Sequence, residues 1–245
     1  MENAAYVGLS RQMTLRRELD IVANNIANAD TSGFKVESLM VETNPKAPAV
    51  TLDGPKPVKF VLDTGVARDF GQGPIRKTDA PLDLAIEGQG FFKISTPDGE
   101  RYTRDGRFRL DDRGRLVTQA GQAVLDEGGG EITLEPDKGA ITVAADGAVS
   151  QGIERVGKVG VVRFDALSAL EKSGDNLFRN TSNQQPQPAS SALVRQGALE
   201  GSNVNSINEI TRMLEVTRAY ESMAKMMDST ADLSRRAVER MGRVQ

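Results

Sequence analysis

The sequence of 245 residues predicts an α+β protein, in which N- and C-terminal helices flank an irregular β-hairpin connector and a compact antiparallel β-domain. Both ends are Pro-free stretches whose apolar residues recur at steps of three and four, as in amphipathic helices. The middle is rich in Gly and holds short β-type runs separated by turn pairs such as Asp98-Gly99. We therefore expect five segments: an N-terminal helix at 1–30, an extended or hairpin connector at 31–80, a β-rich domain at 81–185, a polar linker at 186–205 and a C-terminal helix at 206–245.

The N-terminal helix has a narrow apolar seam. Its residues follow the helical spacing and are Leu15, Leu19, Val22 and Ile26. The stretch from Asn28 to Gly33 ends the helix, because Asn and Gly tolerate left-handed backbone angles and the hydroxyls between them bond nearby backbone groups.

Three amides, Asn24, Asn25 and Asn28, stand close to this end. Asn is poorly suited to a helix interior, because its side chain competes with the backbone for hydrogen bonds. Two interpretations stay open: the amides fray the end of the helix, or they bond to neighbouring subunits.

The C-terminal helix is the longer of the two. Ser206 and Glu209 fit the S-x-x-E capping box, in which each side chain bonds a backbone amide of the first turn. The seam that follows has the spacing of a coiled coil and runs through Ile210, Met213, Thr217, Tyr220, Ala224, Met227 and Ala231. From Ser206 to Met241 such a helix is roughly 50 Å long. The seams fit either an intramolecular helical hairpin or, as we expect from their small residues, packing among many copies of the chain.

One further short helix is expected between the β-type runs. The stretch from Asp165 to Gly174 begins with a capping residue and ends with Gly, as helices commonly do. The polar, Pro-containing stretch after it predicts the linker back to the C-terminal helix.

Composition argues against most catalytic and nucleic-acid functions. The chain has no Cys and no His, which removes thiolate nucleophiles, imidazole bases and the zinc sites built on them. A net charge of −3 offers no general attraction to phosphate backbones. The cluster of Asp105, Asp111 and Asp112 lacks calcium-loop spacing and is interpreted as turn residues. We expect no catalytic residues, no metal, no cofactor, no nucleic acid and no membrane span, and the start of the chain lacks the pattern of a secretory signal.

Several motifs resemble those of the bacterial flagellar rod and hook axial proteins. Residues 23–35 (ANNIANADTSGFK) are similar to the N-terminal signature of that family. Residues 81–92 (PLDLAIEGQGFF) and 102–108 (YTRDGRF) resemble its middle module, and 197–205 (GALEGSNVN) with 218–221 (RAYE) resemble its C-terminal block. The opening residues resemble the proximal-rod type, with the distal-rod type as the alternative.

The resemblance implies a structural subunit of the proximal rod, exported without a cleaved signal by the flagellar type III apparatus. It implies a place in the basal body, within the periplasm, and contacts with other copies, other rod proteins and the surrounding basal-body rings. It also implies terminal helices that are disordered in the free monomer and form the inner coiled-coil layer of the tube. The residues expected at subunit interfaces are Leu15, Leu19, Val22, Asn24, Asn25, Ile26, Asn28, Asn203, Val204, Asn205, Ile210, Met213, Leu214, Thr217, Arg218, Tyr220, Glu221, Ala224, Met227 and Ala231.

Two other classes of function stay open at this point. A periplasmic wall-modifying enzyme would need paired carboxylates in a cleft, for which the three Asp residues above are the candidates. A monomeric adaptor would keep its terminal helices ordered in dilute solution.

Overall fold

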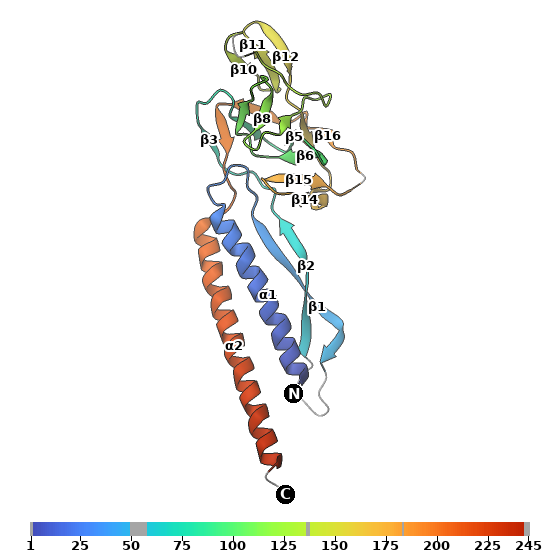
Figure 1. Ribbon diagram of the computed structural model, residues 1–245, viewed down its shortest axis with the longest axis vertical. Helices are drawn as coiled ribbons and strands as arrows, with labels where there is room; N and C mark the ends of the chain where they lie inside the picture. The colour runs from blue at the N-terminus through green and yellow to red at the C-terminus, as the bar shows by residue number, and fades with distance from the viewer. Residues whose placement is uncertain (1, 50–57, 136–137, 183, 243–245) are drawn as a thin grey trace. The chain divides into compact units, whose positions relative to one another are not determined.

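The computed structural model describes residues 2–49, 58–135, 138–182 and 184–242 (Figure 1). The described residues form two long helices, α1 (Glu2–Ala27) and α2 (Ser206–Gly242), with many strands between them, so the α+β class is confirmed. The predicted ranges 1–30 and 206–245 extend beyond the described residues at residue 1 and at 243–245. The strands are β1 (Glu37–Ala49), β2 (Val58–Arg68), β3 (Ile75–Lys77), β4 (Leu84–Glu87), β5 (Phe91–Thr96), β6 (Gly99–Thr103), β7 (Phe108–Leu110), β8 (Leu116–Thr118), β9 (Ala123–Val124), β10 (Ile141–Val143), β11 (Ala148–Gln151), β12 (Glu154–Lys158), β13 (Val161–Arg163), β14 (Leu170–Lys172), β15 (Leu177–Asn180), β16 (Gln187–Pro188), β17 (Leu193–Gln196) and β18 (Ala198–Glu200).

The chain divides into two compact units that interleave along the sequence. One unit, called the helical unit, contains Met1–Ala27, Glu37–Arg68 and Asn205–Gln245. The other, called the β-unit, contains Asn28–Val36 and Asp69–Val204. The expected connector is therefore shared: its hairpin belongs to the helical unit, and the residues on either side of the hairpin belong to the β-unit.

In the helical unit, α1 lies beside α2 and also packs against the hairpin of β1 and β2 (Figure 1). The two helices run antiparallel, because Glu18 of α1 pairs with Arg212 near the start of α2, and Gly8 lies against Met227. The hairpin strands are antiparallel, with Glu37 opposite Arg68, and bulges interrupt the register. Leu15 and Val22 of the predicted seam are each only 2% exposed.

The start of α2 differs from the predicted capping box. Asn205 caps the helix, since its side-chain oxygen accepts the backbone N–H groups of Ile207 (3.1 Å) and Asn208 (3.2 Å). Ser206 is already the first helical residue. The Glu209 carboxylate is not used for the reciprocal capping bond, because a side chain of α1 binds it.

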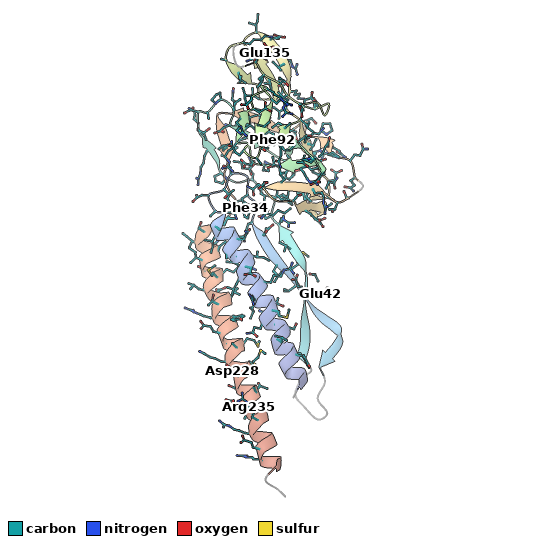
Figure 2. All side chains as sticks on the ribbon, in the orientation of Figure 1. Phe34, Glu42, Phe92, Glu135, Asp228 and Arg235 are labelled. Carbon is teal, nitrogen blue, oxygen red and sulfur yellow. The ribbon has the colours of Figure 1, made fainter. Side chains whose placement is uncertain are left out.

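In the β-unit, the largest sheet orders its strands β14-β15-β6-β5-β9-β8-β7, and β13 also pairs with β5. Strands of two to six residues fit the turn-rich sequence. The interior contains Phe92, which lies within the β-unit (Figure 2) and is fully buried among aliphatic side chains and the ring of Phe108. A second cluster holds edge-to-face rings, among them Phe91 with Phe178 at 5.9 Å between centroids. Because most rings of the chain gather in this unit, its core is larger than the low aromatic content suggests.

Two expectations about the end of the β-rich region were wrong. The predicted helix from Asp165 to Gly174 is a single 3-10 turn, Leu167–Ala169, followed by β14. Leu170 is 1% exposed, so extended pairing with β15 buries it where a short surface helix would not. Residues 186–205, expected as a linker, contain β16, β17 and β18, and the last two pair with β4 and β3.

Candidate assembly interface and its buried polar contacts

The residues expected at subunit interfaces differ widely in exposure within one chain. Three of them are buried: Leu15, Val22 and Asn25. Half-buried are Leu19, Ile26, Asn28, Asn203, Val204, Met213, Thr217, Tyr220, Ala224 and Met227. Exposed are Asn24, Asn205, Ile210, Leu214, Arg218, Glu221 and Ala231. The structure thus packs α1 beside α2. It leaves the two end members of the predicted α2 seam, Ile210 and Ala231, exposed.

Asn25 links all three parts of the helical unit. Its side-chain N–H₂ group donates to the backbone oxygen of Glu37 (2.8 Å) and to the Glu209 carboxylate (2.9 Å). Its oxygen accepts the backbone N–H of Glu37 at 3.0 Å. With 1% exposure, the amide satisfies the first residue of the hairpin and a carboxylate of α2 at once. An Asn in a helix interior is explained here by these contacts.

Asn203 has an equivalent role within the β-unit. Its oxygen accepts the backbone N–H of Val36 at 2.8 Å, and its N–H₂ group donates to the backbone oxygens of Asp69 (2.9 Å) and Gly71 (3.2 Å). The residues after the N-terminal signature and those before α2 are therefore held together by one side chain.

A buried ion cluster lies beside Asn203 and was not predicted from the sequence. Glu200, at 0% exposure, accepts from Lys35 Nζ at 2.6 Å, from Arg104 Nη1 at 2.8 Å and from the backbone N–H of Gly73 at 3.0 Å. The Lys35 ammonium also donates to the backbone oxygen of Gly71 at 2.7 Å. Each charged member comes from one of the three family-like motifs, so the cluster joins the N-terminal signature, the middle module and the C-terminal block.

The backbone conformation at Gly33 allows the chain to pass close to Glu200 and Arg104. Gly33 has a φ of 69° and donates its N–H to the backbone oxygen of Glu200 at 2.8 Å. A Cβ at this position would overlap the backbone of Arg104. The Gly of the signature is therefore required for close packing as well as for the left-handed turn.

The charges in the cluster do not balance. Desolvation by burial lowers the pKa of Lys35, and the neighbouring Glu200 opposes that shift without cancelling it. Arg104 Nε is buried and has no hydrogen-bond partner among the described residues. Two buried cations thus depend on one carboxylate, which makes Glu200 the member whose loss is most costly.

The candidate carboxylates for catalysis occupy turn positions. Asp111 accepts the backbone N–H groups of Arg113 (3.0 Å) and Arg115 (2.8 Å), and the Arg115 guanidinium pairs with it at 2.8 Å. Desolvation is the largest single influence and acts to raise the pKa of Asp111, but the hydrogen bonds and the charge of Arg115 together outweigh it, so the pKa is lowered. A general acid of a glycoside hydrolase needs the opposite shift. Asp105 is likewise paired, with Arg107 at 2.7 Å.

The arrangement defines a class of protein: a chain with two long helices in one unit and a second, β-rich unit, in which the sequence motifs meet in buried polar contacts within each unit. Neither described helix is long and apolar enough to cross a membrane.

Comparison with known proteins gives the family. Three family models match: "Flagella basal body rod protein" at residues 6–35, "Flagellar hook protein FlgE/F/G D1 domain" at 85–151 and "Flagellar basal body rod FlgEFG protein C-terminal" at 195–240. The chain is 64% identical to the flagellar basal-body rod protein FlgF of Caulobacter vibrioides, covering 100% of both chains. It is 36% identical to FlgF of Mesorhizobium japonicum over 99% of both chains. It is 32% identical to the rod protein FlgG of Bacillus subtilis, covering 95% of this chain and 97% of the relative.

The chain belongs to the family of flagellar basal-body rod proteins, and within that family it is of the FlgF type. It is a structural subunit of the rod in the flagellar basal body, and the resemblance noted in the sequence is confirmed. The FlgG alternative is less supported, because its relatives are less similar to this chain.

Proposed function

We propose that the helical unit carries the assembly of this subunit into the rod, and that the β-unit is its independently folded outer module. The observation that supports this most directly is the exposure of α2: Ile207, Ile210 and Leu214 are each at least 49% exposed on a helix of 37 residues. An isolated globular protein rarely leaves so many apolar side chains along one helix uncovered. Neighbouring subunits would cover them.

In this proposal the subunit occupies the proximal rod, a helical drive shaft that transmits motor torque and encloses part of the export channel. The chain passes through the type III apparatus unfolded and enters the periplasm without a cleaved signal. Its terminal helices are disordered in the free monomer and order as the coiled-coil inner layer of the tube. The limited burial of the seam between the antiparallel helices α1 and α2 supports this. Because most residues of that seam are only half-buried, a single chain gains little free energy from pairing its two helices.

Truncation tests whether the helical unit and the β-unit have these separate roles. Deleting Ser206–Gln245 removes α2 but keeps Asp69–Val204, including the Glu200 cluster and every strand of the β-unit. We expect the truncated chain to retain the thermal unfolding transition of the β-unit and to be missing from purified basal bodies of non-motile cells. Normal swimming of a strain that carries only the truncated chain would contradict the proposal.

Amide exchange on the free, full-length chain separates this proposal from a monomeric adaptor. We expect rapid exchange throughout α1 and α2, with protection confined to the β-unit. Protected helices in dilute solution would favour the adaptor. A separate assay tests the hypothesis of a wall-modifying enzyme. That hypothesis requires the chain to lyse purified cell wall and the Asp105→Asn and Asp111→Asn variants to lose this activity.

A further inference from the structure

The chain crosses between the helical unit and the β-unit four times, after residues 27, 36, 68 and 204. Two asparagines bind groups beside these crossings: Asn203 in the β-unit and Asn25 in the helical unit. The printed bonds of each stay within its own unit. Both, however, hold residues next to the points where the hairpin and α2 begin.

On the β-unit side, Asn203 binds both residues that flank the hairpin. Its side-chain oxygen accepts the backbone N–H of Val36 at 2.8 Å, and its N–H₂ group donates to the backbone oxygen of Asp69 at 2.9 Å. Asp69 in turn donates its backbone N–H to the oxygen of Val36 at 3.0 Å. Three parts of the chain that lead into the helical unit are therefore bonded to one another.

On the helical-unit side, Asn25 binds the continuation of two of these parts. It bonds both the N–H and the oxygen of Glu37, which follows Val36, and it bonds the carboxylate of Glu209 in the first turn of α2. Glu37 also pairs with Arg68 at 2.8 Å, at the other end of the hairpin. One amide reaches all these groups only when the start of the hairpin and the start of α2 have a fixed separation.

The bonds of Asn203 hold the chain closer to α2 than the Glu200 cluster does. Asn205, which caps α2, follows Asn203 by two residues and Glu200 by five. The seam between α1 and α2 gives a weak register by itself, because its Met and small residues are only half-buried and Met adapts to irregular gaps. A shift of α2 along α1 therefore costs little unless its first residues are held.

We infer that Asn203 is a positioning residue for assembly, which sets the separation at which Asn25 bridges Glu37 and Glu209. The inference rests on the proposed function, because it names the contact that prepares α1 and α2 to pair during incorporation. Val36 and Asn203 are 167 positions apart in the chain, so folding of the β-unit is what brings them together. A chain with a folded β-unit thus enters assembly with the starts of its hairpin and of α2 already placed.

Gln196 offers a matched control within the β-unit. Its oxygen accepts the backbone N–H of Val143 at 3.0 Å, and its N–H₂ group donates to the backbone oxygens of Pro81 (2.7 Å) and Ile141 (2.9 Å). It is half-buried like Asn203 and has the same pattern of bonds to backbone groups. Its partners, however, lie away from the four crossings.

The comparison uses cells whose only copy of the chain is Asn203→Ala or Gln196→Ala. Both variants should lower the melting temperature of the β-unit by similar amounts in the purified full-length chain. The amount in basal bodies should fall at least tenfold for Asn203→Ala and less than twofold for Gln196→Ala. Equal losses would show that Asn203 acts through stability alone and would overturn the inference.

A double variant tests whether Asn203 acts through Asn25. Added to Asn25→Ala, the change Asn203→Ala should reduce incorporation less than twofold further, because the bridge that it positions is already absent. Losses that multiply in the double variant would show two independent contacts, which contradicts the inference.

An insertion separates position from stability and decides the question where Asn203→Ala does not fold. Two Gly residues placed between Val204 and Asn205 keep the side-chain bonds of Asn203 but move Glu209 two residues further along the chain. The β-unit should melt as in the parent, and incorporation should fall at least tenfold. The same insertion in the exposed turn between Asp98 and Gly99 should assemble nearly normally.

Incorporation of the Val204/Asn205 insertion at the parent level would overturn the inference, since the helix seam alone would then place α2. The proposed function would survive that result, because its own test is the loss of incorporation on deletion of Ser206–Gln245.

Discussion

Replacing Glu200 by Gln should destabilise the β-unit strongly, because the change removes the one negative charge from a buried cluster with two cations. The side chain keeps its shape, and the amide oxygen can still accept a hydrogen bond. Lys35 and Arg104, which are 2% and 4% exposed, would then face each other without a carboxylate. Breaking a buried ion pair by removing one partner costs about 3–5 kcal/mol.

That cost is a large share of the stability of a small domain, which is typically about 5–15 kcal/mol. For a unit of this size it corresponds to a fall in melting temperature of roughly 10 °C. The assay is thermal unfolding of the full-length chain, followed by near-ultraviolet circular dichroism of the rings, most of which lie in the β-unit. Lys35→Met should cost less, since it leaves Glu200 paired with Arg104 at 2.8 Å.

The matched control is Glu87→Gln, which removes a carboxylate from the exposed pair with Arg195 at 2.6 Å. Exposed pairs contribute about 0–1 kcal/mol, so its melting temperature should stay close to that of the parent. If Glu200→Gln unfolded at the same temperature as Glu87→Gln, the buried cluster would not have the structural role assigned to it.

Three further predictions concern other contacts. Asn25→Asp places a second carboxylate beside that of Glu209 and removes a buried donor, at a cost of about 2 kcal/mol. The amount of this variant in purified basal bodies should fall at least tenfold, whereas the exposed Asn24→Asp should assemble nearly normally. Burial, with a smaller effect of a neighbouring carboxylate, raises the pKa of the Tyr102 phenol from 10.0 to about 12. The folded chain therefore holds this proton longer than the unfolded chain does, so the stabilisation is complete below pH 10 and is lost as the pH rises to about 12. The melting temperature of Tyr102→Phe should lack this part of the alkaline decline; an identical decline in both proteins would contradict it. A Cβ at Gly106 would overlap the carbonyl oxygen of Leu84, whereas one at Gly157 would meet open space. Chemical denaturation should show a loss of about 3 kcal/mol for Gly106→Ala and almost none for Gly157→Ala.

The elements with local signals were predictable from the sequence. The end of α1 at Ala27 follows from the Asn- and Gly-containing turn, in which Thr31 donates its backbone N–H to the oxygen of Asn28. The antiparallel β-region follows from its turn pairs, and the long C-terminal helix from its period. In each case the residues that decide the structure lie within a few positions of one another.

The contacts that were missed join residues far apart in the chain. Glu200 meets Lys35 across 165 positions, and Asn25 meets Glu209 across 184. No periodicity signals such a pair, although each of the three family-like motifs contains one charged residue of the cluster. The same cause explains the linker error, because the short strands β17 and β18 form only by pairing with β4 and β3.

The capping error has a different origin. Ser206 and Glu209 satisfy the local rule, but Asn205 satisfies the same amides one residue earlier. Tertiary structure then assigns the Glu209 carboxylate to Asn25. Residue spacing alone cannot decide whether Asn205 or Ser206 caps the helix.

A density map of intact basal bodies, at a resolution that separates helices, would show whether this chain is a subunit of the rod and which layer its helices occupy. We expect copies of this chain in the rod, with α1 and α2 in its inner layer. A rod that lacks this chain, or one in which the two helices face away from the tube, would contradict this expectation.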